Sequence, residues 1–149
     1  MKRKTLVRIH LVATMIAAAT IATFFCSSLA AEINGDELLI RTVKKGIVLS
    51  LPILVIAMPT LGITGNKLAG SSQNPIVFLK KRRMKLVLIN GIMLIALACF
   101  LFYRSHFRAI DSIFMVAQAV EFILGLTNLV LIGLNIAGGL KLSGGPKST

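Results

Sequence analysis

One apolar segment with a carboxylate inside it constrains the fold of this chain more than any other feature. Residues 112–138 read SIFMVAQAVEFILGLTNLVLIGLNIAG, and Glu121 is the only charged residue among them. As an α-helix the segment rises about 40 Å, which is enough to cross a bilayer with some tilt. A carboxylate in contact with hydrocarbon is costly, so we expect the face that carries Glu121 to lie against protein.

Polar and small residues gather on the Glu121 face of this predicted helix. At about 100° per residue they fall within an arc of roughly 100°, and the opposite face is Ile, Leu, Val and Phe. These residues, called the polar stripe below, are Gln118, Glu121, Gly125, Asn128, Asn135 and Gly139. The glycines would let a neighbouring backbone approach, and the amide and carboxyl groups would find hydrogen-bond partners there. The stripe therefore predicts a packing surface between helices.

Composition places the whole chain in the membrane class. Of its 149 residues 56% are hydrophobic, which is more than water-soluble domains usually contain. The formal net charge of +12 could indicate a nucleic-acid partner, but the basic residues lie between apolar segments and are not interleaved with aromatic ones. We therefore expect no nucleic acid as a partner, and we expect the basic clusters to contact lipids with anionic headgroups.

Four apolar segments predict an all-α membrane protein, a four-transmembrane-helix bundle that forms a single membrane domain over residues 1–149. The spans are residues 6–31, 46–64, 86–103 and 112–138. A polar loop is expected at residues 32–45 and a basic one at 65–85. Pro52 and Pro59 predict a kink in the second span.

The first span has an alternative interpretation. Its basic start and the small residues before Glu32 also describe a cleavable signal peptide, although an apolar run of some two dozen residues favours a retained helix.

The distribution of basic residues predicts the orientation of the spans. If the N-terminus is cytoplasmic, the cytoplasmic side holds Lys2, Arg3, Lys4, Arg8, Lys67, Lys80, Lys81, Arg82, Arg83, Lys85, Lys141 and Lys147. The other side holds only Arg41, Lys44, Lys45, Arg104 and Arg108. The positive-inside rule then predicts a multi-pass protein of a bacterial inner membrane with both termini in the cytoplasm. The cluster Lys80, Lys81, Arg82, Arg83 and Lys85 is the expected site of lipid-headgroup contacts.

Two short similarities suggest an internal repeat. Residues 6–10 (LVRIH) match 86–90 (LVLIN), and residues 65–70 (GNKLAG) match 139–144 (GLKLSG). Two pseudo-symmetric helical hairpins would place these matches at equivalent positions. Chance similarity of membrane-boundary segments is the alternative explanation.

Glu121 is the residue most able to take part in chemistry, and its role has two competing interpretations. It is either a proton or cation site with Gln118 and Asn128 as neighbours, or a neutral hydrogen-bonded link between helices. The second interpretation predicts that Glu121→Gln is tolerated. His10 and Asn90 are further candidate partners of the stripe.

No arrangement of residues typical of an enzyme is found. The sequence lacks a nucleophile with a base, a phosphate-binding glycine loop and paired carboxylates, and its two cysteines lack the spacing of metal ligands. We therefore expect no enzymatic activity, metal or cofactor. A haem held by two histidines would need both at one depth, whereas His10 and His106 are predicted to lie about a membrane apart.

The second half of the chain resembles a known group of proteins. The motifs are QAVE at 118–121, Asn128-Leu129, GLN at 133–135, GLKLSG at 139–144 and KRRM at 81–84. Together they resemble small, uncharacterised four-span bacterial inner-membrane proteins over most of the chain. That group has no established activity, so the resemblance implies architecture and bacterial origin but no catalytic residue.

These features lead to an ordered set of expectations about function. The first is an accessory or assembly subunit, in a homo-oligomer or a larger membrane complex, that packs through the polar stripe. The alternative is a small proton-coupled transporter in which Glu121 titrates. A haem-binding redox subunit is third.

Overall fold

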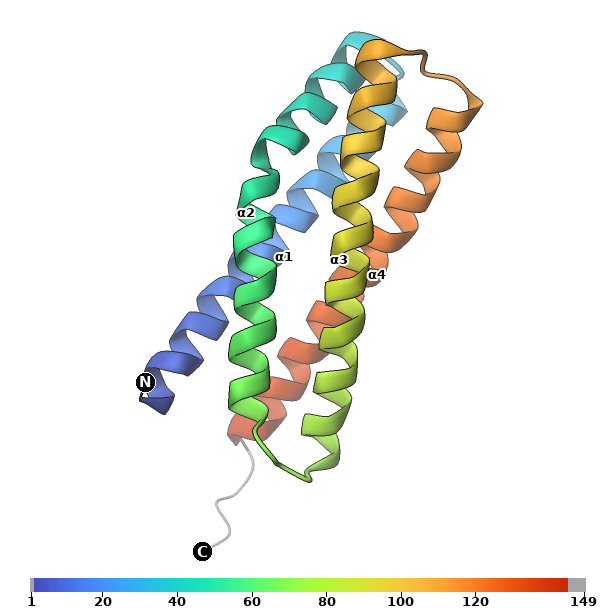
Figure 1. Ribbon diagram of the computed structural model, residues 1–149. Helices are drawn as coiled ribbons and strands as arrows, with labels where there is room; N and C mark the ends of the chain where they lie inside the picture. The colour runs from blue at the N-terminus through green and yellow to red at the C-terminus, as the bar shows by residue number, and fades with distance from the viewer. Residues whose placement is uncertain (1, 145–149) are drawn as a thin grey trace, which may run out of the picture.

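Four long α-helices make up the computed structural model, which describes residues 2–144 (Figure 1). They are α1 (Arg3–Asn34), α2 (Glu37–Ala69), α3 (Pro75–Phe107) and α4 (Ser112–Gly144). Successive helices run in opposite directions, so the N-terminus and the α2–α3 loop share one end, called the proximal end. The α1–α2 and α3–α4 loops share the other, called the distal end.

All four helices are long and apolar enough to cross a membrane. Each has 32 or 33 residues and so rises about 49 Å, against about 30 Å for the hydrocarbon layer of a bilayer. The predicted four-helix membrane bundle is confirmed. Lys147 and the C-terminal tail lie outside the described residues.

The distal loop between α1 and α2 is much shorter than the sequence predicts. Gly35 ends α1 in a left-handed conformation with φ of 75°. Asp36 then caps α2, because its side chain accepts a hydrogen bond of 3.0 Å from the backbone N–H of Leu38. Residues 37–45, predicted as part of a polar loop, therefore belong to α2.

The basic segment before the third span is also helical. Asn74 caps α3 by accepting a 2.9 Å hydrogen bond from the backbone N–H of Ile76, and Pro75 occupies the first turn. The cluster at residues 80–85, predicted in a loop, therefore lies on α3 and extends that helix at the proximal end.

Buried residues recur at alternating steps of three and four on each helix. On α2 they include Ile40, Lys44, Ile47, Leu51, Leu54, Met58 and Leu61. On α4 they include Phe114, Gln118, Gly125, Asn128, Ile132 and Asn135. This spacing keeps one face of a helix against its neighbours in a left-handed bundle. The polar stripe of α4 therefore occupies positions that are filled mostly by apolar residues on the other helices.

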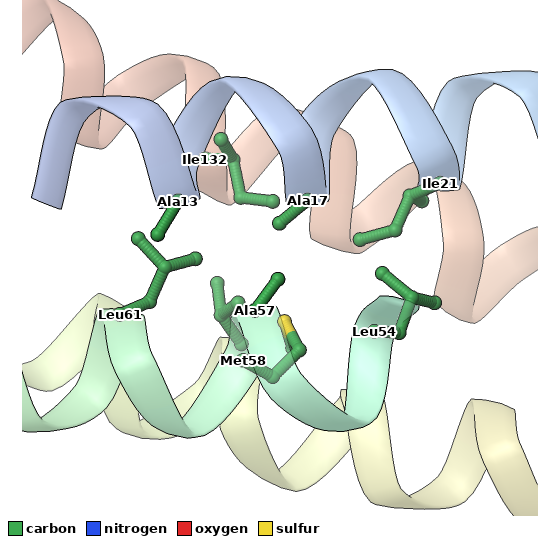
Figure 2. Close-up of a cluster of buried hydrophobic side chains, with 9 residues drawn as sticks. Ala13, Ala17, Ile21, Leu54, Ala57, Met58, Leu61 and Ile132 are labelled. Carbon is green, nitrogen blue, oxygen red and sulfur yellow. The ribbon is translucent and has the colours of Figure 1, made fainter. Parts of the chain in front are cut away.

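The core begins with small residues on α1. Figure 2 shows Ala13, Ala17 and Ile21 of α1 facing Leu54, Ala57 and Leu61 of α2. Alanines let the two helices approach closely, which is how membrane helices gain packing energy without a hydrophobic driving force. Of the four neighbouring helix pairs, α1 and α2 pack most extensively, and α1 and α4 least.

Two details of helix shape bear on the sequence predictions. The middle of α2, which contains Pro52 and Pro59, bends in the manner that the prolines predict (Figure 1). On α4 the stripe glycines do not admit a neighbouring backbone. The atoms nearest to a Cβ built at Gly125 and Gly139 belong to the side chains of Phe25 and Lys80.

The two hairpins share the same up-and-down order, but the matching segments of the sequence do not start at matching places. Leu6 lies in the first turn of α1, whereas Leu86 lies well inside α3. An internal duplication therefore stays a prediction.

A substitution at Leu101 tests the packing of the hydrophobic cluster near the distal end. Leu101 is fully buried in a cluster with Ala31, Ile40, Phe114 and Ala117, to which all four helices contribute. We expect Leu101→Ala to lower the free energy of unfolding by about 2–5 kcal/mol, because the side chain leaves a cavity. Thermal unfolding in detergent measures this. The control Ile92→Ala, at a position on the same helix that is 70% exposed, should stay within about 0.5 kcal/mol of wild type. Equal effects of the two substitutions would contradict the packing described.

Candidate functional site

The polar stripe of α4 faces the interior of the bundle. Gln118, Asn128 and Asn135 are exposed by 2%, 0% and 7%, and the side chain of Glu121 by 12%. The stripe is therefore in contact with helices of this same chain.

A buried lysine meets Glu121. Lys44 of α2 is 1% exposed, and its Nζ donates a hydrogen bond of 2.7 Å to Glu121 Oε2. The same ammonium donates to Ser28 Oγ of α1 at 3.1 Å. Glu121 Oε2 also accepts a 2.9 Å hydrogen bond from Gln118 Nε2. We call these residues, together with the nearby Glu32, the Lys44 cluster.

The Lys44–Glu121 pair joins two helices that are not neighbours in the bundle. The neighbouring pairs in the bundle are α1–α2, α2–α3, α3–α4 and α1–α4, so α2 and α4 stand across a diagonal. The long Lys44 side chain spans this diagonal. The ion pair therefore fixes the distal half of α4 relative to the α1–α2 hairpin.

The cluster lies close to the edge of the expected hydrocarbon layer. Lys44 is about 10 Å from the start of α2, and Glu121 is about 13 Å from the start of α4. Helices of about 49 Å extend beyond a 30 Å hydrocarbon layer by about 10 Å on each side. Lys45, the next residue, is exposed, and its ammonium can reach the headgroups from this depth but not from the membrane centre.

This arrangement changes what a substitution of Glu121 should do. A buried ammonium without a counter-charge costs several kcal/mol, whereas a neutral interhelical hydrogen bond contributes only about 1 kcal/mol. The expectation that Glu121→Gln is tolerated assumes a neutral link between helices. With Lys44 at 2.7 Å the link is an ion pair, so the Gln variant leaves a buried cation unpaired.

Glu32 brings a second carboxylate to the cluster. It lies on α1, four residues after Ser28, and it interacts electrostatically with both Lys44 and Glu121. Its Oε1 atom is buried and accepts no hydrogen bond within residues 2–144, and the same holds for Gln118 Oε1. The cluster thus contains buried acceptor oxygens to which no group of the described residues donates.

The rest of the stripe does not join the cluster. Asn128 Nδ2 donates a long hydrogen bond of 3.4 Å to the Val87 carbonyl of α3, and its Oδ1 has no partner in the described part of the chain. Both polar atoms of the Asn135 side chain are likewise without one. Of the two neighbours expected for Glu121, the structure brings Gln118 to it and leaves Asn128 with Val87.

Neither His10 nor Asn90 reaches the cluster. His10 Nδ1 shares a hydrogen bond of 2.9 Å with Thr64 Oγ1, near the proximal end. The Thr64 hydroxyl already donates to the Thr60 carbonyl at 2.6 Å, so the His10 nitrogen must be the donor. Asn90 is half-buried on α3, and no hydrogen bond joins it to the stripe. His106 lies at the distal end of α3, so one chain does not present two histidines at the same depth.

The basic cluster of α3 is partly used in packing. Lys81 Nζ donates to the Gly70 carbonyl at 2.9 Å, Arg83 makes a weak 3.4 Å contact with the Leu134 carbonyl, and Lys80 lies along Gly138 and Gly139. Arg82 and Lys85 are exposed. These two are best placed for lipid headgroups.

A second ion pair closes the α3–α4 loop. Arg104 of α3 pairs with Asp111, whose other oxygen accepts a 3.1 Å hydrogen bond from the backbone N–H of Phe114. The Arg104 guanidinium and this backbone N–H hold the pKa of the Asp111 carboxyl below its ordinary value. Both contacts fix the position of the first turn of α4. Gln118 and Glu121 lie further along this helix and point towards Lys44.

Comparison of the chain with known protein families, with curated proteins and with solved structures finds no match. The resemblance to four-span bacterial inner-membrane proteins therefore stays an expectation.

The Lys44–Glu121 pair makes a direct prediction about stability. We expect Glu121→Gln to lower the free energy of unfolding by about 3 kcal/mol, because Lys44 loses its counter-charge. The control Glu37→Gln removes a carboxylate from the exposed pair with Arg41 and should cost at most about 1 kcal/mol. Thermal unfolding in one detergent measures both. The double variant Lys44→Met with Glu121→Gln should recover most of the loss, since neither charge remains. Similar melting of the Glu121→Gln and Glu37→Gln variants would show that the pair does not stabilise the bundle.

Proposed function

We propose that this chain is a non-enzymatic integral membrane protein of a bacterial inner membrane that acts as an accessory or assembly subunit. The observation that carries the proposal is that its buried polar groups hold its own helices together. Lys44 and Glu121 link α2 to α4, and the stripe amides face inward. The residues that remain available to a partner are the apolar ones on the outward faces of the helices.

This proposal differs from the sequence expectation in one respect. The stripe was expected to be the packing surface of the subunit, but it is buried within the bundle. Contact with another subunit must therefore use the outward faces, on which large side chains such as Ile56, Ile92 and Val116 are exposed by 66% or more. Membrane helices associate through such faces by van der Waals packing.

The orientation proposed for the chain has both termini in the cytoplasm. The basic cluster at residues 80–85 of α3 and the basic start of α1 lie at the proximal end, which supports a cytoplasmic location for that end. Lys44 is neutralised inside the bundle, so it adds little to the positive charge of the distal loops. We also propose that α1 is retained, since Ala13, Ala17 and Ile21 form part of the core.

Reporter fusions test this orientation. A reporter that is active only in the cytoplasm should be active when fused after Gly70, in the α2–α3 loop, and inactive when fused after Asp111, in the α3–α4 loop. A periplasm-specific reporter should give the reverse pattern. Periplasmic activity after Gly70 would contradict the proposed orientation.

A second candidate function, a coupled carrier, has one observation in its favour. Lys44 is hydrogen-bonded to Glu121 and also interacts electrostatically with Glu32, so it could exchange one carboxylate partner for the other during a transport cycle. Asn128, whose Oδ1 accepts no hydrogen bond in the described part of the chain, and Asn135, neither of whose polar side-chain atoms has a partner there, continue along the same face of α4.

Purification from the native membrane separates the two functions. A tagged chain extracted in mild detergent should bring down one or more further membrane proteins in fixed ratio. The variant with both Lys44→Met and Glu121→Gln should bring down the same proteins, because an accessory role needs the fold and not the charges. A double variant that is folded and keeps its partners but behaves like a deletion strain would favour the carrier instead.

A further inference from the structure

The Lys44 cluster has an excess of negative charge. Two carboxylates interact electrostatically with the single ammonium of Lys44 from α2: Glu121 of α4, which is hydrogen-bonded to it, and Glu32 of α1, which is not. The basic residues of α3 at this end are Arg104 and His106. The Arg104 guanidinium is paired with Asp111, and the His106 ring contacts Ser105 and the Phe102 carbonyl of its own helix. Arg41 is paired with Glu37 on the surface. None of the described residues forms an ion pair with Glu32, so one carboxylate of the cluster has no direct counter-charge.

The cluster also has more hydrogen-bond acceptors than donors. Lys44 and Gln118 both donate to Oε2 of Glu121, so no donor from the described residues reaches Oε1 of that carboxylate. Glu32 Oε1 and Gln118 Oε1 are buried and also without a donor. The Lys44 ammonium has three hydrogens and uses two of them, on Glu121 and Ser28, so it can serve at most one of the three oxygens.

The cluster combines a carboxylate that has no direct counter-charge with buried oxygens that accept no hydrogen bond. These are the properties of a site for a small hard cation. Carboxylate and amide oxygens are hard ligands. A bound proton meets both needs too, because a protonated carboxyl group becomes a hydrogen-bond donor. Glu121 also borders a cavity of about 40 Å³ that is otherwise lined by apolar residues and Gly125, with Phe24, Phe25 and Phe122 among them. These walls favour a small ligand held by the polar side of the cluster.

We propose that the Lys44 cluster binds one monovalent cation, a proton or an alkali-metal ion, between Glu32 of α1 and the Gln118 and Glu121 side chains of α4. The bound cation ties α1 to α4, which is the least extensively packed of the four neighbouring helix pairs. It thereby stabilises the distal half of the bundle, since a ligand that binds only the folded state shifts the unfolding equilibrium. The site does not depend on which of the two functions above is correct, although a coupled carrier would require one.

Thermal unfolding of the full chain in detergent tests the proposal. One series compares sodium, potassium and choline chloride at constant ionic strength and pH 7. A second series varies pH from 5 to 9 in choline chloride. If the ligand is an alkali ion, the melting temperature should rise by about 3 °C or more from choline to sodium or potassium. If the ligand is a proton, the melting temperature should be the same in all three salts and should rise by a similar amount as the pH falls.

The variant Glu32→Gln identifies the site. Glu32 makes no contact with Lys44 short enough for an ion pair, so its replacement leaves the Lys44–Glu121 pair intact, and the new amide can donate where the carboxylate could not. We expect this variant to melt at or above the temperature of the ligand-free wild type and to lose the response to salt or pH. The control Glu37→Gln should keep the full response. The two histidines, His10 and His106, are present in every variant, so they cannot produce a difference between the variants.

Two results would overturn the proposal. One is a wild-type protein whose melting temperature is independent of both the cation and the pH. The other is a response that Glu32→Gln retains in full, since the ligand would then bind elsewhere.

Discussion

A lysine ammonium inside a membrane protein needs a partner of opposite charge, and the distal half of this bundle is arranged to supply one. Lys44 is 1% exposed, and its partner Glu121 is supplied by the helix on the opposite side of the bundle. Each charge alone would be costly to bury, so the position of α4 relative to α2 is fixed by the requirement that the two meet. The neighbouring contacts follow from it: Ser28 takes a second hydrogen of the ammonium, and Gln118 supports the carboxylate from one turn away.

The spans could be predicted because hydropathy depends only on local sequence. The prediction failed at the helix ends, where residues 37–45 and 75–85 are charged and yet helical. Asp36 and Asn74 are strong helix-capping residues, and their presence could have extended both helices. The inward direction of the stripe followed from periodicity on α4 alone, because polar side chains in an apolar helix avoid lipid.

The partner of Glu121 could not be predicted in the same way. Lys44 lies 77 residues earlier in the chain, and no local pattern connects the two. A weaker signal did exist: Lys44 continues the spacing of Ile40, Ile47 and Leu51 and so falls on the buried face of α2. This spacing was not used because residues 37–45 were predicted to be part of a loop. His10 and Asn90 were poor candidates as partners because they lie at another depth, which the order of residues along each helix already implies.

The two halves of the bundle differ in how many hydrogen bonds and ion pairs their buried polar groups make. At the proximal half, Asn128 and Asn135 lie among apolar residues with few hydrogen bonds, and small residues on α1 provide close packing. At the distal half, charged and polar side chains from three helices meet in one cluster. This difference is why a response to ions or protons is sought at the distal end.

The central claim is that Lys44 and Glu121 form a direct ion pair in the folded protein within a bilayer. Solid-state NMR on the chain in lipid, labelled with ¹⁵N at lysine Nζ and ¹³C at glutamate Cδ, measures this most directly. The only lysine–carboxylate pair among residues 2–144 is Lys44–Glu121, so one strong dipolar coupling is predicted, consistent with the 2.7 Å separation of Nζ and Oε2. That coupling should disappear in Glu121→Gln and persist in Glu37→Gln. A folded wild-type protein with no such coupling would contradict the account.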